Sequence, residues 1–500
     1  MVDAYSEGPI NNHSAAYGPR RWWAFIIVCL SSLMIVLDTT IVNVALPSIR
    51  ADLEFSEVSL VWVVNAYLLT FGGFLLLGGR LGDLFGHRRI FLLGVAFFTF
   101  ASLGCGLARS QALLIGARAA QGLGGAVVSA VALSLIMNLF TDTQERAKAV
   151  GIAGFVTAGG GSLGLLLGGT LTGMLNWHWI FLVNLPIGVL ICVLGVGLLP
   201  GRDGRATDGR LDIAGAMTVT ASLMLAIYAI VTGSEIGRSF PRTVWLLLGA
   251  VGFLIVFLRI EVRAQTPLMP LGIFRLRNLA VANIAGLLVA AAMFTWSFIS
   301  ALYLQRVLGF RPLQVGLAFL PANLIAAAFS LGLSARLIIR FGVRLSLISG
   351  LLLAAAGLVL FARAPVGGNL IADVLPAMLL LGLGGGMAGT PLLLAAVSGV
   401  ATGDAGLASG VVNTSFATGA ALGLAFVAAI AGARTRHLLA AGVDLKEALN
   451  GGYHVAFLIG ALLAVTAALL GALLLRSQYE RVSAHDDERA ALSVSICDNN

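Results

Sequence analysis

Charged residues are scarce in this chain of 500 residues. Asp, Glu, Lys and Arg together make up 11% of it, whereas 59% is hydrophobic. An ordinary soluble domain carries about 25% charged residues. Most of the surface therefore cannot face water, which excludes a soluble globular protein.

Lysine is almost absent, because Lys148 and Lys446 are its only occurrences. Neither is followed by Ser or Thr, so the chain has no GxxxxGK[ST] phosphate loop and is not expected to bind ATP. No HExxH zinc motif occurs. Residues 160–164 match GxSxG as a string, but they fall inside an apolar stretch rather than at a strand-to-helix turn. The sequence therefore argues against an enzyme.

Cysteine is also rare, and Cys29, Cys105, Cys192 and Cys497 show no CxxC spacing. The first three fall in apolar stretches, so we expect small core residues and predict no disulfide, metal or other cofactor. The net charge of +8 forms no basic face, because Lys and Arg occur in short clusters between apolar stretches. This pattern argues against a nucleic-acid partner.

Long apolar stretches are what the chain has in quantity. Residues 22–47, 279–304 and 456–475 carry at most one charge each, and each stretch can cross about 30 Å of hydrocarbon. The 62 glycines suit helices that pack closely in lipid. Cuts at charge clusters and Gly/Pro breaks predict an all-α integral membrane protein with fourteen spans: 22–47, 57–79, 90–107, 112–136, 148–172, 178–200, 211–231, 243–260, 279–305, 313–333, 343–362, 370–394, 407–432 and 453–475.

The distribution of positive charge predicts the orientation. With the N-terminus in the cytoplasm, most of the 31 Lys and Arg residues fall on the inner side, which agrees with the positive-inside rule. Both termini are then cytoplasmic, in a multi-pass protein of the cell membrane. The predicted division is an N-terminal tail (1–21), a six-helix half (22–200), two linker helices (201–260), a cytoplasmic loop (261–278), a second six-helix half (279–475) and a C-terminal tail (476–500).

An internal repeat supports two halves. Residues 80–88 (RLGDLFGHR) align with residues 336–344 (RLIIRFGVR), sharing Arg, Leu, Phe, Gly and Arg. The first copy follows the second predicted span and the other follows the tenth. Two six-helix halves with two inserted central helices explain this offset most simply, although a chance match of two basic turns is the alternative.

Four segments together carry a family resemblance. They are residues 37–47 (LDTTIVNVALP), 79–89 (GRLGDLFGHRR), 118–126 (RAAQGLGGA) and 176–188 (NWHWIFLVNLPIG). The chain from about residue 22 to 475 resembles the major facilitator superfamily, specifically its fourteen-span drug:proton antiporter branch. Leu84 and His87 stand where that family usually has basic residues.

The resemblance implies a major facilitator fold and two further motifs. The loop 79–89 resembles a conformational latch that stabilises one access state, with Gly79, Asp83, Gly86, Arg88 and Arg89 as its residues; topogenic charge is the alternative for the arginines. The fifth span resembles the antiporter motif. Its glycines are Gly160, Gly164, Gly168 and Gly169, but Leu165 replaces the usual proline, which weakens the link to obligatory exchange.

Asp38 is the one carboxylate placed deep within a predicted span, roughly 25 Å along the first helix. Arg118 lies at a similar depth on the fourth span, so the two side chains are expected to pair. Intramembrane charges are costly and usually functional. We expect Asp38 to carry the transported proton and Arg118 to bias its protonation; a static buried ion pair is the alternative.

A substrate path requires aromatic and weakly polar residues between the halves. Each candidate is also a possible packing residue. The candidates are Asn43, Trp62, Tyr67, Gln121, Trp296, Tyr303, Asn413 and Thr414.

The sequence thus predicts a secondary active transporter that exports small lipophilic compounds such as drugs in exchange for protons, by alternating access. Its expected partners are the substrate, protons and the lipid bilayer. Three alternatives stay open: a proton-coupled importer or facilitator, an exporter of one narrow metabolite class, and a membrane scaffold that transports nothing.

Overall fold

The computed structural model describes residues 20–56, 59–140, 143–200, 212–235, 240–264, 267, 269, 271–397, 400 and 405–475. The predicted C-terminal tail, residues 1–19 of the predicted N-terminal tail and the start of the predicted linker at 201–211 lie outside this range. Within it the chain is helical and contains no strand. The expected all-α class is therefore confirmed.

Fifteen α-helices form the fold, and two of them, α6 and α7, share one crossing. Thirteen crossings in the described chain are long and apolar enough to span a bilayer, and α11 supplies a shorter fourteenth. The helices are α1 (Arg20–Leu53), α2 (Trp62–Phe85), α3 (His87–Gly106), α4 (Gln111–Leu139), α5 (Thr143–Met174), α6 (Trp179–Leu182), α7 (Asn184–Leu198), α8 (Ile213–Glu235), α9 (Phe240–Arg263), α10 (Arg277–Leu302), α11 (Pro312–Ala328), α12 (Ser334–Phe361), α13 (Leu375–Val397), α14 (Ala405–Ala440) and α15 (Leu445–Leu474).

Local sequence explains several helix starts. The Ser110 side chain accepts a hydrogen bond from the Leu113 amide at the start of α4, and Asp444 does the same for Lys446 at the start of α15. Pro312 is the first residue of α11, a position at which the backbone N–H has no partner within the helix, so a proline is well tolerated there. Between such caps the helices are apolar on most sides, as expected of helices that pack together in lipid.

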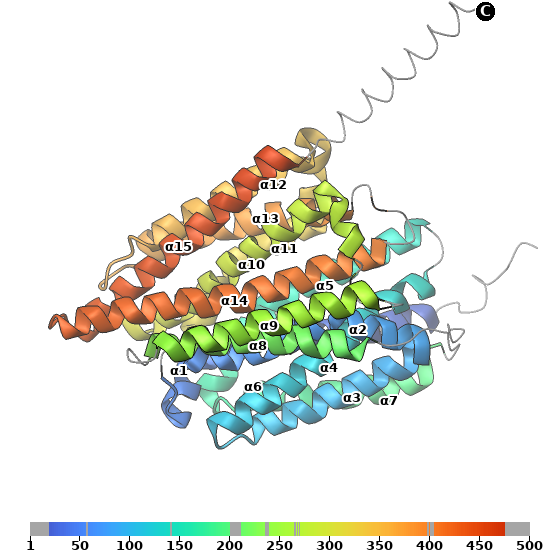
Figure 1. Cartoon of the computed structure of the whole chain (residues 1–500), viewed down its shortest axis with the longest axis horizontal. Helices are drawn as coiled ribbons and strands as arrows, with labels where there is room; N and C mark the ends of the chain where they lie inside the picture. The colour runs from blue at the N-terminus through green and yellow to red at the C-terminus, as the bar shows by residue number, and fades with distance from the viewer. Residues whose placement is uncertain are drawn as a thin grey trace, which may run out of the picture.

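The first seven helices pack as one bundle and α10 to α15 as a second (Figure 1). The inserted helix α8 packs against both bundles, on α2 and on α14, while α9 packs on α8. The Ser222 hydroxyl of α8 donates to the Ala250 carbonyl of α9 at 2.7 Å. Only 11% of the α9 span is buried, so α9 is the most exposed of the candidate spans in the described chain.

The predicted repeat appears in the backbone. Gly86 between α2 and α3 has φ 91° and ψ 126°, and its counterpart Gly342 has φ 80° and ψ 164°. Arg88 donates to the Val196 carbonyl near the end of α7, and the aligned Arg344 donates to the Ala472 carbonyl near the end of α15. The same turn and the same contact therefore occur once in each half.

Several predicted boundaries are wrong around these turns. The loop expected at 80–89 is helical up to Phe85 and again from His87, with Gly86 as the only break. Helix α11 and the π-helical segment η5 (Phe329–Leu333) together match the span expected at 313–333, but α12 begins directly at Ser334, whereas the next span was expected from residue 343. The predicted boundaries rest on charged residues as loop markers, but Arg80, Asp83 and Arg336 lie on helices α2 and α12.

The two halves contact each other along two helix pairs, α2 with α14 and α5 with α11. We call the face where α1 begins the starting face and the other the opposite face. Near the opposite face the Asn43 side-chain N–H donates to the Ser297 hydroxyl at 3.0 Å, and Gln305 donates to the Val44 carbonyl at 3.0 Å. On α5, a Cβ added at Gly169 would lie 2.6 Å from the Pro312 carbonyl oxygen of α11. These contacts hold the halves together on the opposite side.

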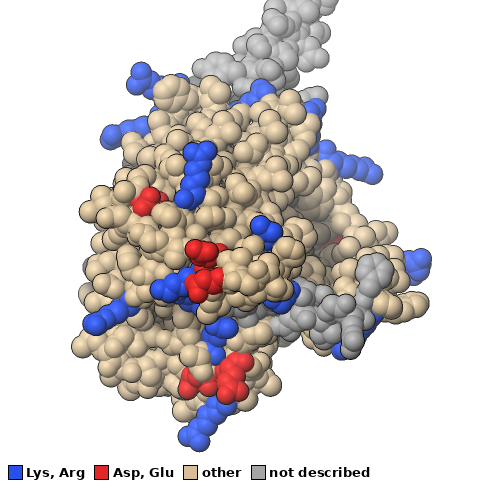
Figure 2. Space-filling model, turned by 90° about the vertical axis from the view of Figure 1, so that its left-hand side faces the viewer, with Lys and Arg blue, Asp and Glu red and all other residues tan. Residues whose placement is uncertain are grey.

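Figure 2 looks onto that side of the molecule, where scattered acidic and basic side chains interrupt an otherwise uncharged surface. Charged groups there include the Asp444 cap of α15, which is exposed. Charge thus gathers beyond the ends of the spans, where it can be hydrated.

The repeated turn gives a stability test. An alanine Cβ at Gly342 would meet no atom within 4 Å, and the same holds at Gly161 in α5, so only the backbone angles separate the two sites. Gly342→Ala should lower the unfolding free energy by about 1–3 kcal/mol, because L-residues rarely adopt its conformation. Gly161→Ala, in a helix, should be neutral or stabilising. Thermal unfolding of both variants checks this, and equal melting temperatures would contradict it.

Candidate functional site

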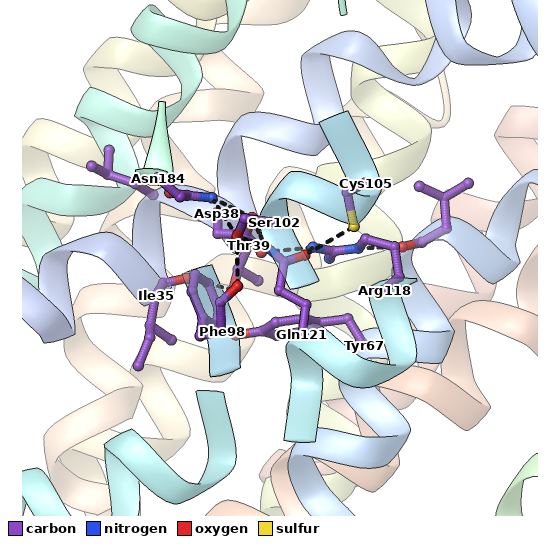
Figure 3. Close-up of polar contacts among 12 residues, drawn as sticks. Ile35, Asp38, Thr39, Tyr67, Phe98, Ser102, Cys105, Arg118, Gln121 and Asn184 are labelled. Atoms are coloured by element: carbon purple, nitrogen blue, oxygen red, sulfur yellow. Dashed lines mark hydrogen bonds and ion pairs between the residues drawn. The ribbon is translucent and has the colours of Figure 1, made fainter. Parts of the chain in front are cut away.

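Asp38 is fully buried in the middle of the N-terminal half. Its side chain has no solvent exposure, and that of Arg118 is 1% exposed. Arg118 Nη1 lies 2.6 Å from Asp38 Oδ2, so the expected pairing is present (Figure 3). The two residues come from α1 and α4, which cross here inside one half rather than between the halves.

The Arg118 guanidinium is held from several sides. Its Nε donates to the Val63 carbonyl at 2.9 Å, and Nη1 also donates to Gln121 Oε1 at 2.6 Å. The Tyr67 ring lies 4.4 Å from its central carbon. A planar cation with several donors can satisfy a carboxylate, an amide and an aromatic face together, which lysine could not do.

Two amides complete the surroundings of Asp38. Gln121 Nε2 donates to Asp38 Oδ1 at 2.6 Å and to the Ser102 hydroxyl at 2.7 Å. Asn184 Nδ2 donates to the same Asp38 oxygen at 3.0 Å. Ser102 in turn donates to the Phe98 carbonyl at 2.9 Å. We call Asp38, Ser102, Arg118, Gln121 and Asn184 the carboxylate cluster.

The carboxylate cluster needs close helix packing. Gly122, next to Gln121 on α4, faces α2, where an added Cβ would lie 2.3 Å from the Tyr67 carbonyl oxygen. Only glycine allows α4 to approach α2 this closely. The close approach carries Arg118 to within hydrogen-bond distance of the α2 backbone.

The cluster is chemically suited to a carboxylate and not to a carboxylic acid. Asp38 accepts hydrogen bonds from three side chains, and each of these contacts uses an N–H donor. All three N–H groups therefore point at a carboxylate acceptor, and the Arg118 charge has its counter-ion 2.6 Å away.

Comparison with known proteins decides the family. Residues 28–424 match the Major Facilitator Superfamily. The chain belongs to this superfamily. It is 39% identical to puromycin resistance protein pur8 of Streptomyces alboniger, over 95% of each chain. It is 38% identical to cephamycin export protein CmcT of Amycolatopsis lactamdurans, over 82% of this chain and 85% of that protein.

Other similar proteins agree with this membership. The chain is 36% identical to the lincomycin resistance protein of Streptomyces lincolnensis, covering 83% and 85% of the two chains. Its fold is similar to the crystal structure of a bacterial homologue of the human lysosomal transporter Spinster in an inward-facing, occupied conformation. That match has a TM-score of 0.66 at 16% identity and covers 92% of this chain and 98% of the other. This major facilitator protein is thus a multi-pass transporter of the cell membrane, with relatives in antibiotic export and resistance.

The residues predicted for a substrate path of this transporter do not lie together. Tyr67 and Gln121 are buried inside the N-terminal half, at the carboxylate cluster. Tyr303 is buried in the C-terminal half, where its hydroxyl donates to the Pro365 carbonyl. Asn43 joins the halves, and the Trp296 ring lies 5.5 Å from that of Phe319. Asn413 on α14 is exposed, Trp62 is half-buried, and Thr414 Oγ1 is buried with no hydrogen-bond partner in the described chain.

The glycines of the altered antiporter motif lie at helix contacts. An added Cβ at Gly160, Gly164 or Gly168 would lie within about 3 Å of α1 atoms, whereas Gly169 faces α11 of the other half. Leu165 stands at the position of the usual proline. Its carbonyl oxygen faces Gly316 of α11, where an added Cβ would lie only 2.6 Å from it. Helix α5 therefore packs on both halves with no proline in its sequence.

The predicted latch residues surround the α2–α3 turn. Asp83 Oδ1 lies 3.2 Å from His87 Nε2, four residues on and across the Gly86 break. Arg89 is exposed, while Arg88 reaches α7. Gly79 lies on α2, where an added Cβ would approach only Ala130 of α4, at 3.9 Å. These contacts of Asp83, Arg88 and Gly79 all lie within the N-terminal half.

Sequence reasoning missed Ser102 and Asn184. Asn184 stands in the segment 176–188, which carried the family resemblance but suggested no role for a single residue. Ser102 stands in an apolar helix where a lone serine usually bonds its own backbone, as it also does here. An asparagine within the sixth apolar span is the sequence signal that could have identified Asn184.

The ion pair predicts a non-additive double mutant. Arg118→Leu should destabilise the protein by about 3–5 kcal/mol, because it leaves the buried Asp38 carboxylate unpaired. In Asp38→Asn/Arg118→Leu no buried charge remains, so much of that loss should be recovered. Thermal or denaturant unfolding in detergent measures both, with Asp38→Asn alone completing the cycle. Additive effects of the two substitutions would contradict direct pairing.

Proposed function

We propose that this transporter exports small lipophilic compounds of the antibiotic type in exchange for protons, with Asp38 as the proton carrier. The observation that carries the proposal is the buried Asp38 carboxylate with three side-chain donors. The names of its relatives, which refer to puromycin resistance, cephamycin export and lincomycin resistance, support the substrate class.

Coupling follows from the cost of burying charge. An anionic Asp38 stabilises the sealed cluster, because Arg118 is neutralised and the amides donate to it. A protonated Asp38 weakens these contacts, so the helices α1, α4 and α7 that carry them favour another arrangement. A proton entering from the outside thereby drives the change of state, and its release inside resets the cluster.

Alternating access uses the contacts between the halves. The bonds from Asn43 to Ser297 and from Gln305 to Val44 lie near the opposite face, together with the approach of α5 to α11. We take the starting face as cytoplasmic, in line with the positive-inside rule. In this proposal these contacts lie on the exterior side, and export requires them to separate.

The substrate class also follows from the residues at the contact between the halves. The Asn43 amide meets the Ser297 hydroxyl across the halves, and the neighbouring Trp296 ring lies 5.5 Å from that of Phe319 within the second half. These uncharged polar and aromatic groups support a lipophilic substrate that is neutral or weakly cationic. A strongly anionic substrate would find no counter-charge among these four residues.

A proton-coupled importer of the same fold is the second candidate. Leu165 favours it, because the proline of the antiporter motif is absent from α5. Everted vesicles decide between the two: an exporter accumulates puromycin or a lipophilic dye when the vesicle interior is made acidic, whereas an importer loses it.

Asp38→Asn should abolish efflux driven by a pH gradient, because an amide cannot carry the proton, while substrate binding persists. Cells or vesicles with puromycin, lincomycin and a lipophilic dye, with and without a protonophore, provide the measurement. Asp444→Asn is the matched control, because Asn also caps helix α15 and the site is exposed. Efflux by Asp38→Asn equal to that of the control would refute the assignment.

Linking the halves should stop transport. Once the native cysteines are replaced, cysteines placed at Asn43 and Ser297, whose side-chain atoms are 3.0 Å apart, can be joined by a short bis-thiosulfonate reagent, which forms a disulfide to each thiol and releases sulfinate. Transport should fall to background on cross-linking and return with reductant, and each single-cysteine variant should stay active. Full transport by the fully cross-linked protein would show that this contact need not open.

A further inference from the structure

Asn184 and Gln121 donate to the same oxygen of Asp38, but their own oxygens are held differently. Gln121 Oε1 accepts from Arg118 Nη1 at 2.6 Å, and the Cys105 thiol lies 3.6 Å away from it. Asn184 Oδ1 is buried and has no hydrogen-bond partner in the described part of the chain. Buried amide oxygens are nearly always paired, so this one requires an explanation.

This difference in hydrogen bonding of the two amide oxygens decides which side-chain amide can rotate by 180°. Rotating Gln121 by 180° would point its N–H groups at the Arg118 guanidinium, so its orientation is fixed. Rotating Asn184 breaks no bond to its oxygen. It would place Oδ1 where Nδ2 now lies, within hydrogen-bond distance of Asp38 Oδ1. While Asp38 is anionic this orientation is unfavourable, because two acceptors would face each other.

We propose that Asn184 is the positioning residue for the transported proton, and that its side-chain amide turns over when Asp38 is protonated. This rests on the proposed role of Asp38 as the proton carrier. A proton from bulk water forms an O–H bond at Asp38 Oδ1. The N–H donation from Asn184 is lost, and the new O–H donates to Asn184 Oδ1. The same residue thus serves both protonation states without leaving the buried cluster.

The other ionisable groups around Asp38 do not change charge in this step. They are Arg118 from α4, Tyr67 from α2 and Cys105 from α3. In general a guanidinium is a cation, and a phenol and a thiol are neutral at physiological pH. Helices α5 and α10 also pack against α1, and their ionisable residues Glu145, Lys148 and Arg277 lie near the starts of these helices. The described residues of α6 and α7 at the cluster, Phe181 and Asn184, do not titrate.

Infrared difference spectroscopy of the full chain in lipid vesicles, recorded as the pH is lowered, tests the proposal. A carboxylic-acid carbonyl band that is absent in Asp38→Asn should rise. An asparagine side-chain carbonyl band should change with it, move on ¹³C-asparagine labelling, and vanish in Asn184→Leu. Asn450→Leu is the control, because Asn450 is also buried, donates to the Ala364 carbonyl and has an unpaired oxygen, but lies in the other half.

The outcomes separate the two proposals. An Asp38 band without an asparagine band overturns the turning amide and leaves Asp38 as carrier, whereas no Asp38 band at any pH overturns the carrier itself. The labelled unsubstituted protein gives this answer even where Asn184→Leu fails to fold.

The pH profile of efflux adds a second readout. In Asn184→Leu the half-maximal pH should rise by about one unit, because the carboxylate loses a charge-assisted hydrogen bond. Asn184→Ser, which still donates and accepts, should restore most of the profile, and Asn450→Leu should not move it. An unchanged profile in a folded Asn184→Leu protein would mean that Asn184 only packs.

Discussion

The ion pair between Asp38 and Arg118 is the constraint on which the N-terminal half depends. Two buried charges in a lipid-embedded bundle are costly unless each is paired and hydrogen-bonded. Asp38 is satisfied by α4 and α7, and Arg118 also by the backbone of α2. Four crossings are therefore tied to one carboxylate. A change at this one carboxylate therefore affects four helices and not only one side chain.

The pair itself could be predicted, because depth along a helix follows from residue counting and few charges compete for the same layer. Asn184 and Ser102 could not, because a neutral polar residue has no cost that singles it out in a sequence. Their positions depend on which faces of α3 and α7 turn toward α1. Tyr67 and Gln121 show the same limit: their depth was predicted, but they face the interior of one half and not the other half.

The fold was predictable to the level of spans and repeat, because apolar length and the paired Gly86 and Gly342 turns are local properties of the sequence. The residues at which the helices begin and end were less predictable. Helices continue past the lipid wherever backbone hydrogen bonding remains favourable, so charged residues mark the lipid boundary and not the helix end. Residues 80–85 are an example, since they lie on α2.

The placement of the inserted helices makes the two seams between the halves unequal. Helix α8 packs on both α2 and α14 and so covers the seam that these two helices form. Along the other seam, α5 meets α11, and neither inserted helix packs on that pair in the described chain. The two flanks of the described chain therefore differ: an inserted helix lies over one contact between the halves, and the other contact is left uncovered by both inserted helices.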